Sequence, residues 1–76
     1  MATIIEPDEF YETFDFIHAC APDNQARRMC EARNAIDGEQ WQTAAYILRN
    51  VADDESGILA EYCERLAEYC DRESII

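Results

Sequence analysis

The stretch that decides the fold is residues 39–51, EQWQTAAYILRNV. Its apolar side chains recur every three or four residues, which places them on one face of an α-helix. A helix with such a face is stable only when that face is buried against other elements. We therefore expect this stretch to form the central helix of the core. The expected buried face consists of Trp41, Ala44, Ala45, Leu48 and Val51, with Ile47 at its edge.

Helical spacing also occupies the region near the N-terminus. Pro7 stands where a proline is typical of the first turn of a helix, and Asp8 and Glu9 follow it where the helix dipole favours negative charge. The pattern predicts a helix over residues 7–20. Its expected buried face is Phe10, Phe14, Ile17 and Ala21.

A second helix is predicted over residues 24–36. Pro22 disfavours helical geometry in the residue before it, and Asp23 is a residue type that caps helix N-termini. Gly38 suits the left-handed position just past a helix C-terminus and leads directly into the helix at 39–51. The weaker apolar face of this second helix is expected to be Ala26, Met29, Cys30 and Ile36.

The last predicted helix covers residues 56–72 and contains an internal repeat. The sequence Leu-Ala-Glu-Tyr-Cys at residues 59–63 recurs at 66–70, so its leucines, tyrosines and cysteines share one face. Two heptads are fewer than a coiled coil normally shows, and we expect this face to pack inside the bundle. A seam between two identical chains is the alternative.

Together these patterns predict one all-α domain over residues 1–76, a compact bundle of about four short helices. No stretch shows the sustained alternation of apolar and polar residues that is typical of a strand. A chain of 76 residues is too short for a two-domain enzyme. Such a small domain buries only about 60% of its unfolded surface, which leaves self-association open.

Charge is the most unusual feature of the composition. The chain carries 17 acidic residues against 6 arginines and no lysine, and its formal net charge is −11. This balance disfavours direct binding to nucleic acid or to anionic lipid, since both ligands favour clustered basic residues. No apolar run reaches the roughly 18 residues of a membrane span, and the N-terminus lacks the features of a secretory signal. We expect a cytoplasmic protein with basic partners.

The four cysteines and the single histidine give weak grounds for chemistry. Without an export signal, the cysteines are expected to be reduced and to serve as small apolar side chains. Cys63 and Cys70 lie two helical turns apart, about 10.5 Å, and cannot share one zinc ion. His18 could pair with a cysteine of another helix, but a lone histidine beside an apolar helix face is more often a half-buried packing residue. We therefore expect no metal, no cofactor and no catalysis, with a thiol or metal protein as the least favoured alternative.

The acidic residues of the last helix form a regular row. Glu61, Glu64, Glu68 and Asp71 follow one another at steps of three, four and three residues, which aligns them along one side of the helix. Like charges at this spacing destabilise a helix slightly, so helix stability alone does not favour such a row. The row is therefore the main candidate for binding a partner.

The first helix offers a second acidic group and two aromatic candidates. Glu9, Glu12 and Asp15 extend the candidate surface, and Asp53, Asp54 and Glu55 form a third acidic group. Tyr11 and Phe16 lie beside the apolar stripe, as Tyr46 does on its own helix, so we expect one or two exposed aromatics. Aromatic side chains rimmed by polar groups are common interface anchors. Tyr11 and Phe16 are the first choices.

These observations point to a binding protein. A rigid row of carboxylates with few compensating cations is similar to a nucleic-acid backbone and is complementary to a basic groove. The chain resembles, in size and charge, small acidic inhibitors encoded by phages, including anti-CRISPR and anti-restriction proteins. We expect an inhibitor or regulator that occupies the basic, nucleic-acid-binding surface of a partner protein or complex. The alternatives are an ordinary soluble acidic surface and a homodimeric adaptor that uses the tyrosine and cysteine face of the last helix.

Overall fold

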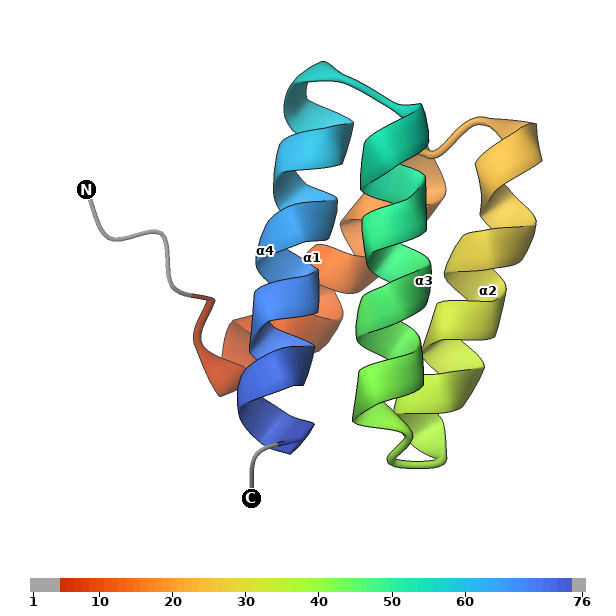
Figure 1. Ribbon diagram of the computed structural model, residues 1–76. Coiled ribbons are helices and arrows are strands. Elements are labelled where there is room, and N and C mark those ends of the chain that lie inside the picture. Colours follow the sequence, from red (N-terminus) through yellow and green to blue (C-terminus); the bar gives the residue numbers. More distant parts are fainter. Residues whose placement is uncertain (1–4, 75–76) are drawn as a thin grey trace.

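The computed structural model describes residues 5–74, which form a bundle of four helices (Figure 1). This confirms the predicted all-α class. The predicted helix bounds are correct to within three residues, and α1 matches its prediction at both ends. The helices are α1 (Pro7–Cys20), α2 (Asp23–Asp37), α3 (Trp41–Asp54) and α4 (Gly57–Ser74).

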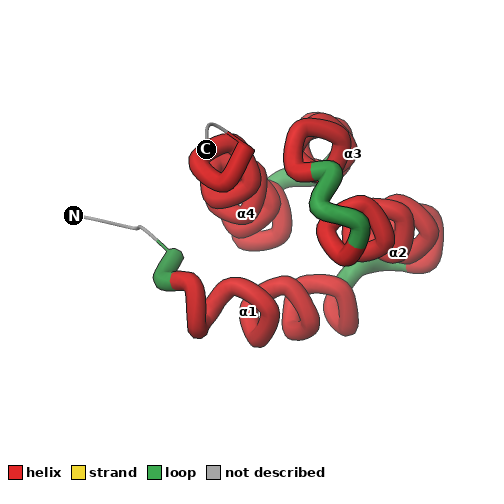
Figure 2. Tube along the Cα trace, turned by 90° about the horizontal axis from the view of Figure 1, so that it is seen from below, coloured by secondary structure: helices red, strands yellow, loops and turns green. Residues whose placement is uncertain are grey.

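The helices are arranged as an antiparallel three-helix layer crossed by α1. Figure 1 shows α2, α3 and α4 running alternately down, up and down, joined by short turns. In Figure 2 these three helices are seen nearly end-on, whereas α1 is seen lengthwise beneath them. The crossing helix therefore covers one side of the layer and leaves the opposite side, formed by α3 and α4, open to solvent.

The start of α1 follows from its sequence. Pro7 is the first helical residue, and the backbone N–H of Glu6 donates to the carboxylate of Glu9 at 3.5 Å. Such a bond satisfies a donor that the helix itself leaves without a partner. The predicted face is confirmed for Phe10, Phe14 and Ile17, which are buried against the other helices.

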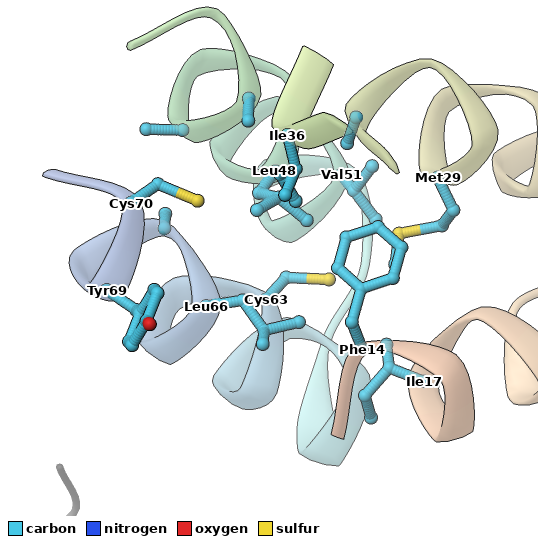
Figure 3. Close-up of a cluster of buried hydrophobic side chains, with 14 of the residues drawn as sticks. Phe14, Ile17, Met29, Ile36, Leu48, Val51, Cys63, Leu66, Tyr69 and Cys70 are labelled. Atoms are coloured by element: carbon cyan, nitrogen blue, oxygen red, sulfur yellow. The ribbon is translucent and has the colours of Figure 1, made fainter. Parts of the chain in front are cut away.

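The core lies between the three-helix layer and α1 (Figure 3). The helices α3 and α4 supply most of the buried residues, largely from their predicted faces, and Trp41, Ile47, Leu59 and Tyr62 pack at the edge of the core only partly buried. The repeat in α4 thus serves the interior of a single chain, as we expected. The buried residues from these two helices are Ala44, Ala45, Leu48, Val51, Ala52, Cys63, Leu66, Ala67, Tyr69 and Cys70.

The prediction for α2 was partly wrong. Met29 and Ile36 are buried, but Cys30 is exposed and Ala26 is only half-buried. Asp23 does not cap the helix, since it is already the first helical residue and Pro22 precedes it in an extended conformation.

Gln25 lies in the core, although the apolar pattern of α2 did not predict a buried residue at this position. Its side chain is 1% exposed, and its amide nitrogen donates to Glu55 at 3.1 Å while its amide oxygen accepts from Arg28 at 3.3 Å. A buried amide is tolerated when both ends have partners.

The turn between α2 and α3 also differs from expectation. The left-handed position belongs to Glu39, with a φ of 60°, whereas Gly38 has a φ of −90°. Three backbone bonds hold the turn: Gly38 N–H donates to Asn34, Glu39 N–H to Ile36 and Gln40 N–H to Ala35. The turn is one residue longer than a helix end at Gly38 implied, so α3 begins at Trp41. Its other end is Asp54.

Candidate partner-binding surface

The acidic row of α4 lies on the solvent side of the bundle. Glu61, Glu64 and Glu68 are exposed, and Asp71 is half-buried at the edge that faces α3. Ten residues of helix separate Glu61 from Asp71, which corresponds to about 15 Å along the axis. The sequence prediction that these four carboxylates share one side is consistent with the helix bounds.

Two of the four carboxylates have arginine partners within the chain. Arg65 donates to Glu61 at 2.6 Å, and Arg49 of α3 donates to Asp71 at 2.6 Å. The hydrogen bond to Asp71 raises the pKa of Arg49, and the nearby charges of Glu64 and Glu68 act in the same direction. Within residues 5–74, Glu64 and Glu68 have no ion-pair partner, so they are the most available charges of the row.

The acidic residues predicted on α1 lie on a different side of the molecule. Tyr69 of α4 stacks on Phe10 of α1 with ring centroids 4.2 Å apart, which marks the side of α4 that faces α1. Asp71 instead faces α3 through Arg49. The exposed acids of α1, among them Glu9 and Glu12, are therefore separated from the α4 row by the body of the bundle (Figure 2).

Arg33 of α2 modifies the predicted surface on α1. Its guanidinium donates to Asp15 at 2.6 Å and lies over the ring of Tyr11, 4.9 Å from the centroid. Tyr11 is 41% exposed and Asp15 is neutralised by this contact. Phe16, by contrast, is 63% exposed and remains an open aromatic side chain. Phe16 is thus the more exposed and the less engaged of the two aromatic candidates.

Two further exposed apolar side chains stand out. Tyr46 of α3 is 69% exposed and lies one helical turn before Arg49, the partner of Asp71, which in the antiparallel pair of α3 and α4 places it at the Asp71 end of the row. Its place off the apolar stripe was the sequence signal for this exposure. Ile58, at the start of α4, is 67% exposed, and sequence reasoning missed it because it stands next to Leu59 in an apolar pair.

We define the acidic face as Tyr46, Glu64, Glu68 and the paired residues Arg49 and Asp71. It lies on the open side of the three-helix layer, opposite α1 (Figure 2). All of its residues come from α3 and α4, whose positions are fixed by the core that they share. This face therefore combines carboxylates and one exposed aromatic ring on two helices that pack together.

The cysteines fall into two classes. Cys20 and Cys30 are exposed, whereas Cys63 and Cys70 are buried and face the core (Figure 3). Burial raises the pKa of Cys63 to about 11 and that of Cys70 to about 12. In the described part of the chain, no group of three potential ligands is placed to hold a metal ion. Across the same residues, no helix is both long and apolar enough to cross a bilayer.

The raised pKa values of the two buried thiols predict a loss of stability at alkaline pH. The ordinary pKa is near 9, so above pH 9 the unfolded chain releases protons that the folded protein still holds. The stability that the two protonated thiols contribute is therefore fully present below pH 9 and is lost as the pH rises towards 11 and 12. Each thiol should contribute a loss on the order of 2–3 kcal/mol, measured by urea unfolding from pH 8 to 11.

Two double variants separate this effect from other alkaline changes. Burial also raises the pKa of Tyr69, which adds to the loss in every variant that keeps it. Replacing Cys20 and Cys30 by serine should leave the slope of stability against pH unchanged, because both are exposed. Replacing Cys63 and Cys70 by alanine should flatten it, although that variant is less stable throughout. Equal slopes in both variants would contradict the assignment.

No known protein family, curated protein sequence or solved structure matches this chain.

Proposed function

We propose that this protein binds a basic surface of a protein partner, and that it inhibits or regulates that partner by occupying a surface made for nucleic acid. The observation that carries this proposal is the uncompensated charge of the fold. Only five of the 17 carboxylates lie in ion pairs within residues 5–74. Most of the acidic side chains therefore remain available to an external cation.

The charge density of the α4 row is comparable to that of one nucleic-acid strand. Four carboxylates over about 15 Å give one charge per roughly 5 Å, whereas one strand of DNA carries a charge per about 3.4 Å of axis. Glu64 and Glu68 alone would be a weak imitation. The proposal therefore also requires Glu61 and Asp71 to be available to the partner.

These two paired carboxylates can exchange their arginines for those of a partner. The ion pairs of Glu61 and Asp71 are partly exposed, with side-chain exposures of 57% and 44% for the two acids. Exposed ion pairs contribute only about 0–1 kcal/mol, so replacing one arginine by another costs little. A basic groove can thus engage all four residues, with Tyr46 as an adjacent apolar contact.

The proposal predicts binding that depends strongly on salt. The full chain should be immobilised and incubated with lysate of its source cell, or of that cell's host, at about 50 mM and about 500 mM salt. We expect nucleic-acid-binding proteins among those retained at low salt, with at least about a tenfold decrease in retention at high salt. Excess duplex DNA should compete with the retained partner. Retention that is insensitive to salt and to DNA would contradict nucleic-acid mimicry.

The structure offers no specific support for the homodimeric adaptor. The tyrosine and cysteine face of α4 packs inside the chain, where Cys63 and Cys70 are fully buried and Tyr69 stacks on Phe10. Tyr62 is half-buried, and the guanidinium of Arg65 lies 5.1 Å from its ring centroid. A second copy would have to displace α1 to reach this face.

A further inference from the structure

A hollow of about 330 Å³ lies at the end of the bundle where α3 begins and α4 ends. It is formed by three segments that the antiparallel topology brings together: the α2–α3 turn, the first turn of α3 and the last turn of α4 (Figure 1). Its size is within the lower range of small-ligand sites, which is about 300–1,000 Å³. The lining residues with side chains of functional interest are Glu39, Trp41, Gln42, Thr43, Glu73 and Ser74.

The lining of this hollow carries negative charge without an internal counter-ion. Glu39 and Glu73 contribute two carboxylates, and no lining residue is basic. Arg72 neighbours Glu73 in sequence but is engaged elsewhere: its guanidinium lies over the ring of Tyr69 and donates to the carbonyl of Ile5 at 3.4 Å. The start of α3 contributes about half a positive charge, which two carboxylates outweigh. The hollow therefore favours a cation over an anion.

Trp41 is the aromatic residue of the lining, and its ring is held in place by the core. Its ring lies 6.1 Å from the ring of Phe10 and 6.1 Å from that of Tyr69, edge-on to both, and these rings are anchored in the core. Trp41 is half-buried and is one of the residues that line the hollow. Indole is the aromatic group that attracts cations most strongly. An indole beside two carboxylates is suited to a planar cation, which can stack on the ring and donate hydrogen bonds from its edge to the carboxylates.

We propose that this hollow binds an arginine side chain of the basic partner. The guanidinium group is planar, stacks on aromatic faces and donates to carboxylates in fixed directions, which an ammonium group cannot do equally well. This inference rests on the proposed function, since the arginine comes from the partner that the acidic face engages. Glu73 lies two residues after Asp71, which turns its side chain about 200° around α4 from the row, so an arginine in the hollow would be a contact separate from the row.

The hollow can be tested without the partner, because Trp41 is the single tryptophan of the chain. N-acetyl-arginine amide should be titrated at constant ionic strength while the fluorescence of Trp41 is recorded. We expect a saturable change with half-saturation on the order of 10 mM. N-acetyl-citrulline amide, which has the same shape but no side-chain charge, should produce no saturable change over the same range.

Two double variants with equal changes of charge provide the control. E39Q/E73Q removes both carboxylates of the hollow and should raise the half-saturation concentration about fivefold or more. E64Q/E68Q removes two carboxylates from the acidic face and should change it less than about twofold. Circular dichroism should confirm that both variants keep their helices.

Three results would overturn the arginine site: no saturable response to the arginine compound, an equal response to the citrulline compound, or equal weakening in the two variants. None of these would affect salt-dependent capture of a partner, which tests the proposed function separately. Conversely, capture that is insensitive to salt and DNA, together with a normal arginine response, would leave a cation site without the proposed mimicry.

Discussion

Replacing Phe14 by alanine should destabilise the folded protein by about 4 kcal/mol, because large-to-small substitutions of a buried phenylalanine cost about 3–5 kcal/mol. Phe14 is fully buried between α1 and the three-helix layer, where it lies beside Met29 and Val51 in the core (Figure 3). A domain of this size has a total stability of about 4–11 kcal/mol. The variant should therefore be close to unfolding at 37 °C, as measured by urea and thermal unfolding.

Phe16 gives this prediction a matched control on the same helix. It is the same residue type two positions later, and it is 63% exposed. Phe16→Ala should change the stability by no more than about 0.5 kcal/mol, as surface substitutions usually do. Similar losses from both substitutions would show that α1 does not present the face described here. Reduced partner retention by Phe16→Ala alone, at unchanged stability, would identify Phe16 as an interface anchor.

The fold was predictable where apolar spacing dominated. The spacing of Phe10, Phe14 and Ile17 places them on one face of a helix. Three such large apolar side chains are stable only when that face is buried. The prediction was wrong in part on α2, where Met29 and Ile36 are buried as expected but Ala26 and Cys30 are not. There the interior accepted Gln25 because Arg28, one turn later on the same helix, and Glu55, which is distant in sequence, satisfy its amide. The contact with Glu55 is set by tertiary structure and leaves no periodic signal.

The turn after α2 shows a second limit of local patterns. Glycine is the residue most often found in the left-handed region, so Gly38 was the natural choice for that position. The structure instead places Glu39 there and lengthens the turn by one residue. The longer turn brings the Glu39 carboxylate to the start of α3, beside Trp41. The hollow at this end of the bundle therefore could not be predicted from the sequence.

The candidate surface was predictable only as a set of helical stripes. Spacing alone places Glu61, Glu64, Glu68 and Asp71 on one side of a helix, but it does not say which neighbour that side meets. The structure shows that Arg49 reaches across from α3 to Asp71, and that the α1 acids face another side. Two separate acidic surfaces result: the one on α1 carries Tyr11 and Phe16 as exposed aromatics, and the one on α3 and α4 carries Tyr46.

Reversing the two unpaired charges of the acidic face should abolish partner binding at low salt. Glu64→Lys with Glu68→Lys places two cations where the partner's basic residues would lie, and like charges across an interface cost several kcal/mol. We expect retention to decrease at least about 100-fold at about 50 mM salt. Stability should change little, since both side chains are exposed and neither lies in an ion pair within the described residues.

A variant with the same net charge but a different location distinguishes a specific face from general electrostatic attraction. Asn24→Lys, Glu31→Lys and Asn34→Lys together alter exposed positions on the outer side of α2 and also shift the formal net charge from −11 to −7. General attraction depends on net charge and would weaken equally in both variants. A specific face requires that the α2 variant keep most of its retention while the α4 variant loses it. Equal losses would mean that the acidic residues serve solubility or non-specific attraction, and that α4 holds no binding site.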